Sequence, residues 1–111
     1  MRIDGAMEGD VLVLRVGETR IDAASAVTFK ERVRTLIAGH DGPVTIDMAR
    51  VDFLDSSGLG ALVAVMKMLG GDRRLCLRDC STVVGRVLSL TRMDRVFDLE
   101  PRTGPAGRDA A

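Results

Sequence analysis

The sequence contains no tryptophan, no tyrosine and only three phenylalanines. Proteins that hold single-stranded nucleic acid stack its bases on aromatic rings, and this chain has almost none to offer. Basic residues are not in excess either, because 16 lysines and arginines are matched by 16 aspartates and glutamates. A nucleic-acid-binding face needs an excess of positive charge. We therefore expect no direct contact with nucleic acid.

Long hydrophobic runs are also missing. None approaches the roughly 20 apolar residues of a membrane-spanning helix, and the first residues lack the apolar core of a secretory signal. We expect a cytoplasmic protein that does not contact a membrane. Cys76 and Cys80 are the two cysteines, and His40 is the one histidine. A metal site needs more ligands than these, so we expect no metal, no cofactor and unpaired thiols.

The 111 residues are enough for one domain with its own core. Apolar periodicity predicts the order strand (1–7), strand (11–16), helix (26–37), strand (44–48), helix (59–69), strand (74–78), helix (84–91) and a short strand or turn (95–99). This order predicts an α/β fold, with a small, mostly parallel mixed sheet that begins with an antiparallel hairpin.

The strands at 44–48 and 74–78 alternate apolar with polar residues. Strands buried on both faces usually read as unbroken apolar runs. We therefore expect the helices mainly on one face of the sheet, a partly polar opposite face, and Asp47 in solvent. Residues 101–111 have nothing large and apolar to bury. They are expected to form a flexible C-terminal tail after a single domain over residues 1–100.

Small polar residues, Asp55-Ser56-Ser57-Gly58, stand where the helix over 59–69 begins. The start of a helix has unpaired N–H groups and the positive end of the helix dipole. The plain interpretation is that Asp55 caps this helix, as Asp22 would cap the preceding one. A hydroxyl at this place is also well suited to accept a negative charge.

Catalytic motifs are incomplete around these serines. A Gly-x-Ser-x-Gly elbow centred on Ser57 would need glycine where Asp55 stands, and a dinucleotide fingerprint would need glycine where Val63 stands. The chain has no phosphate-binding loop of the Gly-Lys-Ser/Thr type. We therefore expect no catalytic residues and no enzymatic activity.

The helix that follows Ser57 is apolar on more than one side. Its expected core stripe is Leu59, Leu62, Val63, Met66 and Leu69. Its other side carries Ala61, Ala64, Val65 and Met68, with Lys67 as the only charge. Because a surface helix is normally polar there, either another part of the fold covers this side or it is a docking surface. We expect a docking surface made of Gly60, Ala61, Ala64, Val65 and Met68.

Three segments together resemble a known family. The segment 53–60 (FLDSSGLG), after an alternating strand, resembles the signature of STAS domains, in particular of anti-sigma factor antagonists. The segments 22–26 (DAASA) and 93–97 (MDRVF) are similar to two further parts of these proteins. The run 17–21 (GETRI) is offset from the Gly-Glu-Leu-Asp-like run of many members.

The resemblance implies a mostly parallel sheet of four or five strands, and a regulator. The unmodified protein would bind an anti-sigma factor that is also a serine kinase, and so free a sigma factor. That kinase would phosphorylate Ser57, whose neighbours Asp55, Ser56 and Gly58 complete the motif, and the complex would dissociate. A metal-dependent serine phosphatase would reverse the reaction. Asp22 matches an acidic position near the acceptor.

Two other functions remain open. The chain could be a STAS subunit of another assembly, such as a lipid-transport complex or a signalling scaffold, without phosphorylation. It could also bind a small molecule or be a minor enzyme, which would require a pocket near Ser57. We expect a monomer or a weak dimer.

Overall fold

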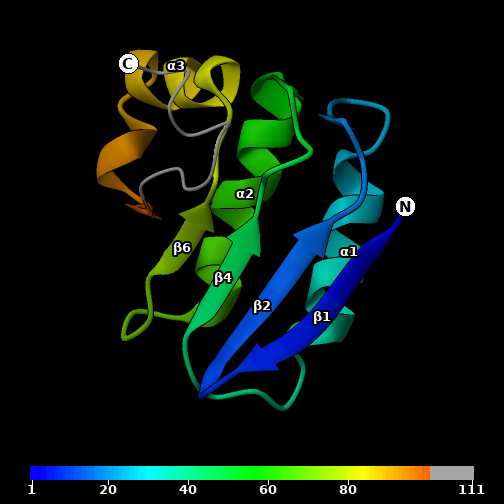
Figure 1. Ribbon diagram of the computed structural model, residues 1–111, viewed down its shortest axis with the longest axis vertical. Helices are drawn as coiled ribbons and strands as arrows, with labels where there is room; N and C mark the ends of the chain where they lie inside the picture. The colour runs from blue at the N-terminus through cyan, green and yellow to red at the C-terminus, as the bar shows by residue number, and fades with distance from the viewer. Residues whose placement is uncertain (101–111) are drawn as a thin grey trace.

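The computed structural model describes residues 1–100, which form a five-stranded sheet, a separate two-stranded ladder and three α-helices (Figure 1). The elements are β1 (Ile3–Glu8), β2 (Val11–Val16), β3 (Arg20–Ile21), α1 (Ala26–Ile37), β4 (Val44–Asp47), β5 (Phe53–Leu54), α2 (Ser56–Leu69), β6 (Leu75–Arg78), α3 (Thr82–Leu90), the 3-10 turn η1 (Met93–Arg95) and β7 (Asp98–Leu99). The expected tail, 101–111, lies outside the described residues.

The main sheet has the order β1-β2-β4-β6-β7, with β1 antiparallel to β2 and every other pair parallel. The predicted hairpin is confirmed: its turn contains Gly9, whose φ of +63° is easy for glycine. β3 and β5 form the separate parallel ladder. The α/β class and mixed sheet predicted from the sequence are therefore confirmed.

The core lies between the sheet and the helices α1 and α2, which Figure 1 shows behind the strands. Leu14, Ile46 and Leu77, on three neighbouring strands, are fully buried. They belong to one apolar cluster with Phe29 of α1 and Leu62 of α2. The predicted stripe of α1 is buried except for the half-buried Leu36. The predicted stripe of α2 is only partly correct: Leu62 and Leu69 are buried, whereas the other three residues are half-buried.

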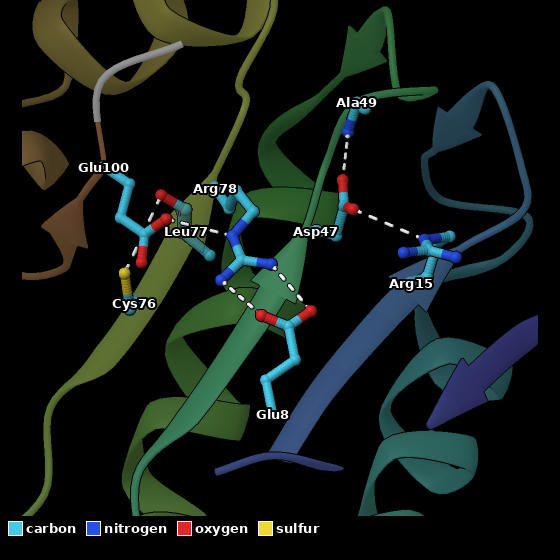
Figure 2. A network of polar contacts seen from close by, with 8 residues as sticks. All are labelled: Glu8, Arg15, Asp47, Ala49, Cys76, Leu77, Arg78 and Glu100. Carbon is cyan, nitrogen blue, oxygen red and sulfur yellow. Dashed lines mark hydrogen bonds and ion pairs between the residues drawn. The ribbon is translucent and has the colours of Figure 1, made fainter. Parts of the chain in front are cut away.

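Asp47 is not in solvent as predicted, since only 7% of it is exposed. Figure 2 shows its carboxylate between two partners at the end of β4. The Ala49 N–H donates to Oδ1 at 2.9 Å, and Arg15 Nε donates to Oδ2 at 3.4 Å. The alternation of the strand does place Asp47 on the face away from the helices. Its neighbours on that face, which sequence spacing does not reveal, bury it.

Figure 2 shows a second group of charged side chains on the face of the sheet away from α1 and α2, with Arg78 between Glu8 and Glu100. Arg78 donates two hydrogen bonds of 3.2 Å to the Glu8 carboxylate and one of 2.9 Å to Glu100. The hydrogen bonds that Arg78 donates to these carboxylates raise the pKa of its guanidinium. Val13 and Thr45, which are partners in the register of β2 and β4, are each only 3% exposed, so this face is buried beyond Asp47 as well.

At the opposite end of the sheet, Arg73 joins two loops. Its Nη1 donates to the carbonyl oxygens of His40, at 2.9 Å, and Gly42, at 2.8 Å. Its Nε donates to the Leu69 carbonyl at the end of α2, at 3.2 Å. One guanidinium thus holds the turn before β4 against the end of α2.

We predict that Arg73→Ala lowers the free energy of unfolding by about 2 kcal/mol, because it leaves partly buried carbonyl groups without a charged donor. The neighbouring Arg74→Ala is the control: Arg74 forms an ion pair with Asp98 in which both side chains are more than half exposed, and it donates one exposed hydrogen bond of 3.0 Å to the Arg95 carbonyl. Such pairs contribute up to about 1 kcal/mol. Urea unfolding followed by circular dichroism measures both. Equal losses in the two variants would contradict this role for Arg73.

Candidate functional site

The two polar segments singled out in the sequence meet at one edge of the molecule. In the β3–β5 ladder, Arg20 pairs with Phe53 and Ile21 with Leu54, in parallel. The next residues, Asp22 and Asp55, therefore leave the ladder side by side. The Ala23 N–H donates to Asp55 Oδ2 at 3.1 Å and joins the two segments directly.

Asp55 caps α2, as the sequence predicted. Its Oδ1 accepts the Gly58 N–H at 2.8 Å, which satisfies one of the free donors of the first helical turn. Its other oxygen accepts the hydrogen bond from Ala23. One carboxylate therefore fixes both the start of α2 and the loop before α1.

Asp22 does not cap α1, which corrects the prediction. The N-cap of α1 is Ser25, and no side chain supplies its capping hydrogen bond. Asp22 lies one turn earlier, where Oδ1 accepts the Ala24 N–H at 3.1 Å and the Ser25 hydroxyl lies 3.2 Å from the same oxygen. Its side chain organises the turn that leads into the helix, and this turn is not helical in the structure.

Sequence reasoning missed Arg20. Its Nε donates to Asp22 Oδ2 at 3.1 Å, and its guanidinium lies 4.0 Å from the centre of the Phe53 ring. The hydrogen bond from Arg20 is the main cause that lowers the pKa of Asp22, so this carboxylate stays ionised at neutral pH. The sequence did contain a sign of this pair: Arg20 and Asp22 stand at i and i+2 around the apolar Ile21, which is buried in the structure. In a strand, this spacing places the side chains of Arg20 and Asp22 on the same side.

Gly58 allows α2 to begin directly against β3. A Cβ atom at this position would lie 2.0 Å from the Ile21 carbonyl oxygen and 2.8 Å from a side-chain atom of Leu54. No residue other than glycine fits such a close approach to backbone. Gly58 is buried, whereas Ser56 and Ser57 are exposed. Within residues 1–100, neither hydroxyl forms a side-chain hydrogen bond.

The predicted docking face of α2 is partly wrong. Ala61 is 3% exposed and Val65 is fully buried. The reason is that α2 is the central helix: it packs against α1 and also contacts β3, β5 and β6. A helix with neighbours on several sides is apolar on several sides. For Ala61 and Val65, the fold itself covers the helix.

The other three predicted docking residues remain accessible. Gly60 is exposed, and a Cβ atom added there would meet no neighbour within 4 Å, whereas Ala64 and Met68 are half-buried. They follow Ser57 at i+3, i+7 and i+11, which places all four on one stripe of the helix. The predicted acceptor and the accessible part of the predicted surface therefore lie in line.

Within residues 1–100, no three histidine, cysteine, aspartate or glutamate side chains are grouped as metal ligands, and no helix is long and apolar enough to cross a membrane. Cys76 and Cys80 do not form a disulfide. Burial and the nearby Glu100 raise the pKa of the Cys76 thiol, which keeps it protonated and unreactive at neutral pH.

Comparison with known proteins gives consistent results. The family model of the STAS domain matches residues 3–106. The anti-sigma-F factor antagonist RsfB of Mycobacterium tuberculosis is 29% identical over 89 residues, which are 80% of this chain and 72% of RsfB.

Solved structures share the fold. An anti-sigma factor antagonist from Mycobacterium paratuberculosis is 26% identical, with a TM-score of 0.75 over 98% of this chain and 92% of that one. The Bacillus cell fate determinant SpoIIAA, solved in its phosphorylated form, is 20% identical, with a TM-score of 0.62 over 98% of each chain.

We predict opposite effects for two alanine substitutions in the first turns of α2. Gly58→Ala should lower the free energy of unfolding by more than about 2 kcal/mol, because its Cβ would overlap backbone that cannot move without separating α2 from β3. Gly60→Ala should raise it by up to about 1 kcal/mol, because alanine costs less entropy than glycine in an open helical position. Thermal and urea unfolding measure both, and a neutral Gly58→Ala would contradict the close contact.

Proposed function

The chain belongs to the STAS domain family, and we propose that it is an anti-sigma factor antagonist whose binding is switched off by phosphorylation of Ser57. The unphosphorylated form binds an anti-sigma factor of the serine kinase type and releases a sigma factor. The kinase transfers phosphate to Ser57, and a metal-dependent serine phosphatase removes it. The chain acts in this cycle by binding, and has no catalytic residue of its own.

The observation that carries the proposal is the position of the Ser57 hydroxyl. It is exposed at the second residue of α2, and the accessible stripe of Gly60, Ala64 and Met68 continues directly from it. A kinase can reach such a hydroxyl without unfolding the domain. RsfB, an anti-sigma-F factor antagonist, supports the assignment of function. The phosphorylated form of SpoIIAA supports the view that this fold tolerates a phosphoryl group.

The start of α2 is suited to hold the new charge. A phosphoserine carries about −1.5 to −2 charges at pH 7, and the N-terminal end of a helix stabilises negative charge. The nearest carboxylates are already engaged: Asp55 accepts two backbone N–H groups, and Asp22 is paired with Arg20. We therefore expect phosphorylation to leave the fold intact.

The same charge is unfavourable in a protein–protein contact. A partner that covers Ser57 and the stripe beside it would have to remove water from a dianion without supplying a counter-charge. A loss of about 2.7 kcal/mol weakens binding a hundredfold, which is enough to act as a switch. The physical basis of the switch is therefore repulsion at the interface rather than a change of fold.

We predict that phosphoserine at position 57 weakens binding to the cognate anti-sigma kinase at least a hundredfold and shifts the melting temperature by no more than a few degrees. The proteins to compare are the unmodified chain, the chain with phosphoserine at 57, and a matched control with phosphoserine at the equally exposed position 56. Calorimetric titration with each purified anti-sigma kinase of the source genome gives the dissociation constants. Ser57→Ala should bind and resist release by ATP.

Several outcomes would refute the proposal. One is tight binding by the chain phosphorylated at 57, and another is a collapsed fold. A third is a chain that binds none of the kinases in the titration and also gains no phosphate, judged by its intact mass after incubation with each kinase and ATP. That third result would favour a STAS subunit of another assembly, in which Ser57 is never modified.

A further inference from the structure

Helix α3 has apolar side chains on two sides, and one of these sides is uncovered. Val84 and Leu88 are fully buried against the rest of the domain. Val83 and Leu90, seven positions apart on another side, are 54% and 79% exposed. A surface helix should be polar on its outer side, so these residues indicate a contact surface.

The uncovered side forms an open groove of about 240 Å³, lined by Thr82, Val83, Arg86, Val87 and Leu90. We call it the α3 groove. Its lining is apolar except for the hydroxyl of Thr82 and the guanidinium of Arg86. A small apolar groove with a single charge is suited to one apolar side chain and one polar group of a partner.

The α3 groove lies at the same end of the molecule as Ser57. Ser81 caps α3 after β6 in the way that Asp55 caps α2 after β5, and the Val84 N–H donates to the Ser81 hydroxyl at 3.1 Å. α3 packs on β5, whose last residue immediately precedes Asp55. Figure 1 shows α3 beside the upper end of α2. A protein that covers Ser57 would therefore lie close to α3, the helix on which the groove is formed.

Two candidate occupants fit poorly. In a symmetric antiparallel pairing of α3 with a second copy, Arg86 near the middle of the exposed stripe would face the Arg86 of that copy. A nine-residue helix also offers far less than the roughly 1,200 Å² that a stable interface buries. The chain's own residues 101–111 contain no valine, leucine, isoleucine, methionine or phenylalanine to fill the groove.

The local charge indicates the partner's chemistry. Residues 82–100 hold three arginines and three acidic residues, but Arg86 is the one charged residue that lines the groove, and no ion pair of Arg86 is found within residues 1–100. An acidic residue next to apolar side chains would match both Arg86 and the groove around it. Because the groove is too small to hold a protein by itself, its occupant must belong to a partner that is also held elsewhere.

We propose that the α3 groove is a second contact for the anti-sigma kinase, filled by an amphipathic segment of that partner with an apolar anchor and a carboxylate that pairs with Arg86. This inference rests on the proposed function. The contact adds affinity without involving Ser57, so it strengthens the binding of both the unmodified and the phosphorylated chain. Its effect and that of the phosphate should multiply as independent factors.

The test is titration of the same purified kinases with α3 variants. Val83→Thr with Leu90→Gln should weaken binding about tenfold, and Arg86→Glu by a similar factor, with a smaller dependence on salt. Matched controls away from Ser57 are Met7→Thr, at a β1 residue 54% exposed, and Arg34→Glu, at an exposed arginine in the last turn of α1. Both controls should change affinity less than twofold, and all variants should melt within a few degrees of the parent chain.

The outcomes separate the two proposals. Parental affinity in all α3 variants, with release by phosphoserine 57 intact, would overturn the groove as a contact and leave the proposed function standing. A parent chain that binds no kinase would overturn both. Analytical ultracentrifugation tests whether a second copy of this chain occupies the groove. If the parent chain is a dimer and the α3 variants are monomers, the groove binds a second copy and the inference is overturned.

Discussion

The contact between Gly58 and the Ile21 carbonyl is the constraint on which the site depends. It lets the first turn of α2 lie directly on the backbone of β3, at a distance that any side chain would prevent. Asp55 reinforces the arrangement, because one oxygen holds the helix and the other holds the loop that follows β3. With Gly58 facing inward, the helical period turns Ser57 outward. The exposure of the serine thus follows from the burial of the glycine.

The charges of the molecule are divided between two faces with different tasks. On the face of the sheet away from α1 and α2, the hydrogen bonds of Asp47 and Arg78 join side chains from different strands. At the edge near Ser57, carboxylates are engaged by backbone N–H groups or by Arg20. In the proposed function, a phosphate added at Ser57 would act on a partner rather than on the domain.

Helices α2 and α3 both carry apolar residues on more than one side, with different results. Those on α2 suggested an exposed docking face, but α1 and the strands cover Ala61 and Val65. On the shorter α3, comparable residues are uncovered. Whether a helix is central or peripheral decides between these outcomes, and that depends on how many elements pack against it. The periodicity of a sequence shows how many sides of a helix are apolar, but it does not show which of those sides other elements cover.

Periodicity and turn chemistry by themselves determined the order of the main strands and helices, the opening hairpin, the cap at Asp55 and the segment that contains Ser57. These features depend on residues close together in the chain, so local patterns reveal them. Tertiary structure alone decided the burial of Asp47, the pairing of Arg20 with Asp22, the need for glycine at position 58 and the exposure of α3. Each of these depends on which distant segments become neighbours, and that is fixed only when the sheet and its helices assemble.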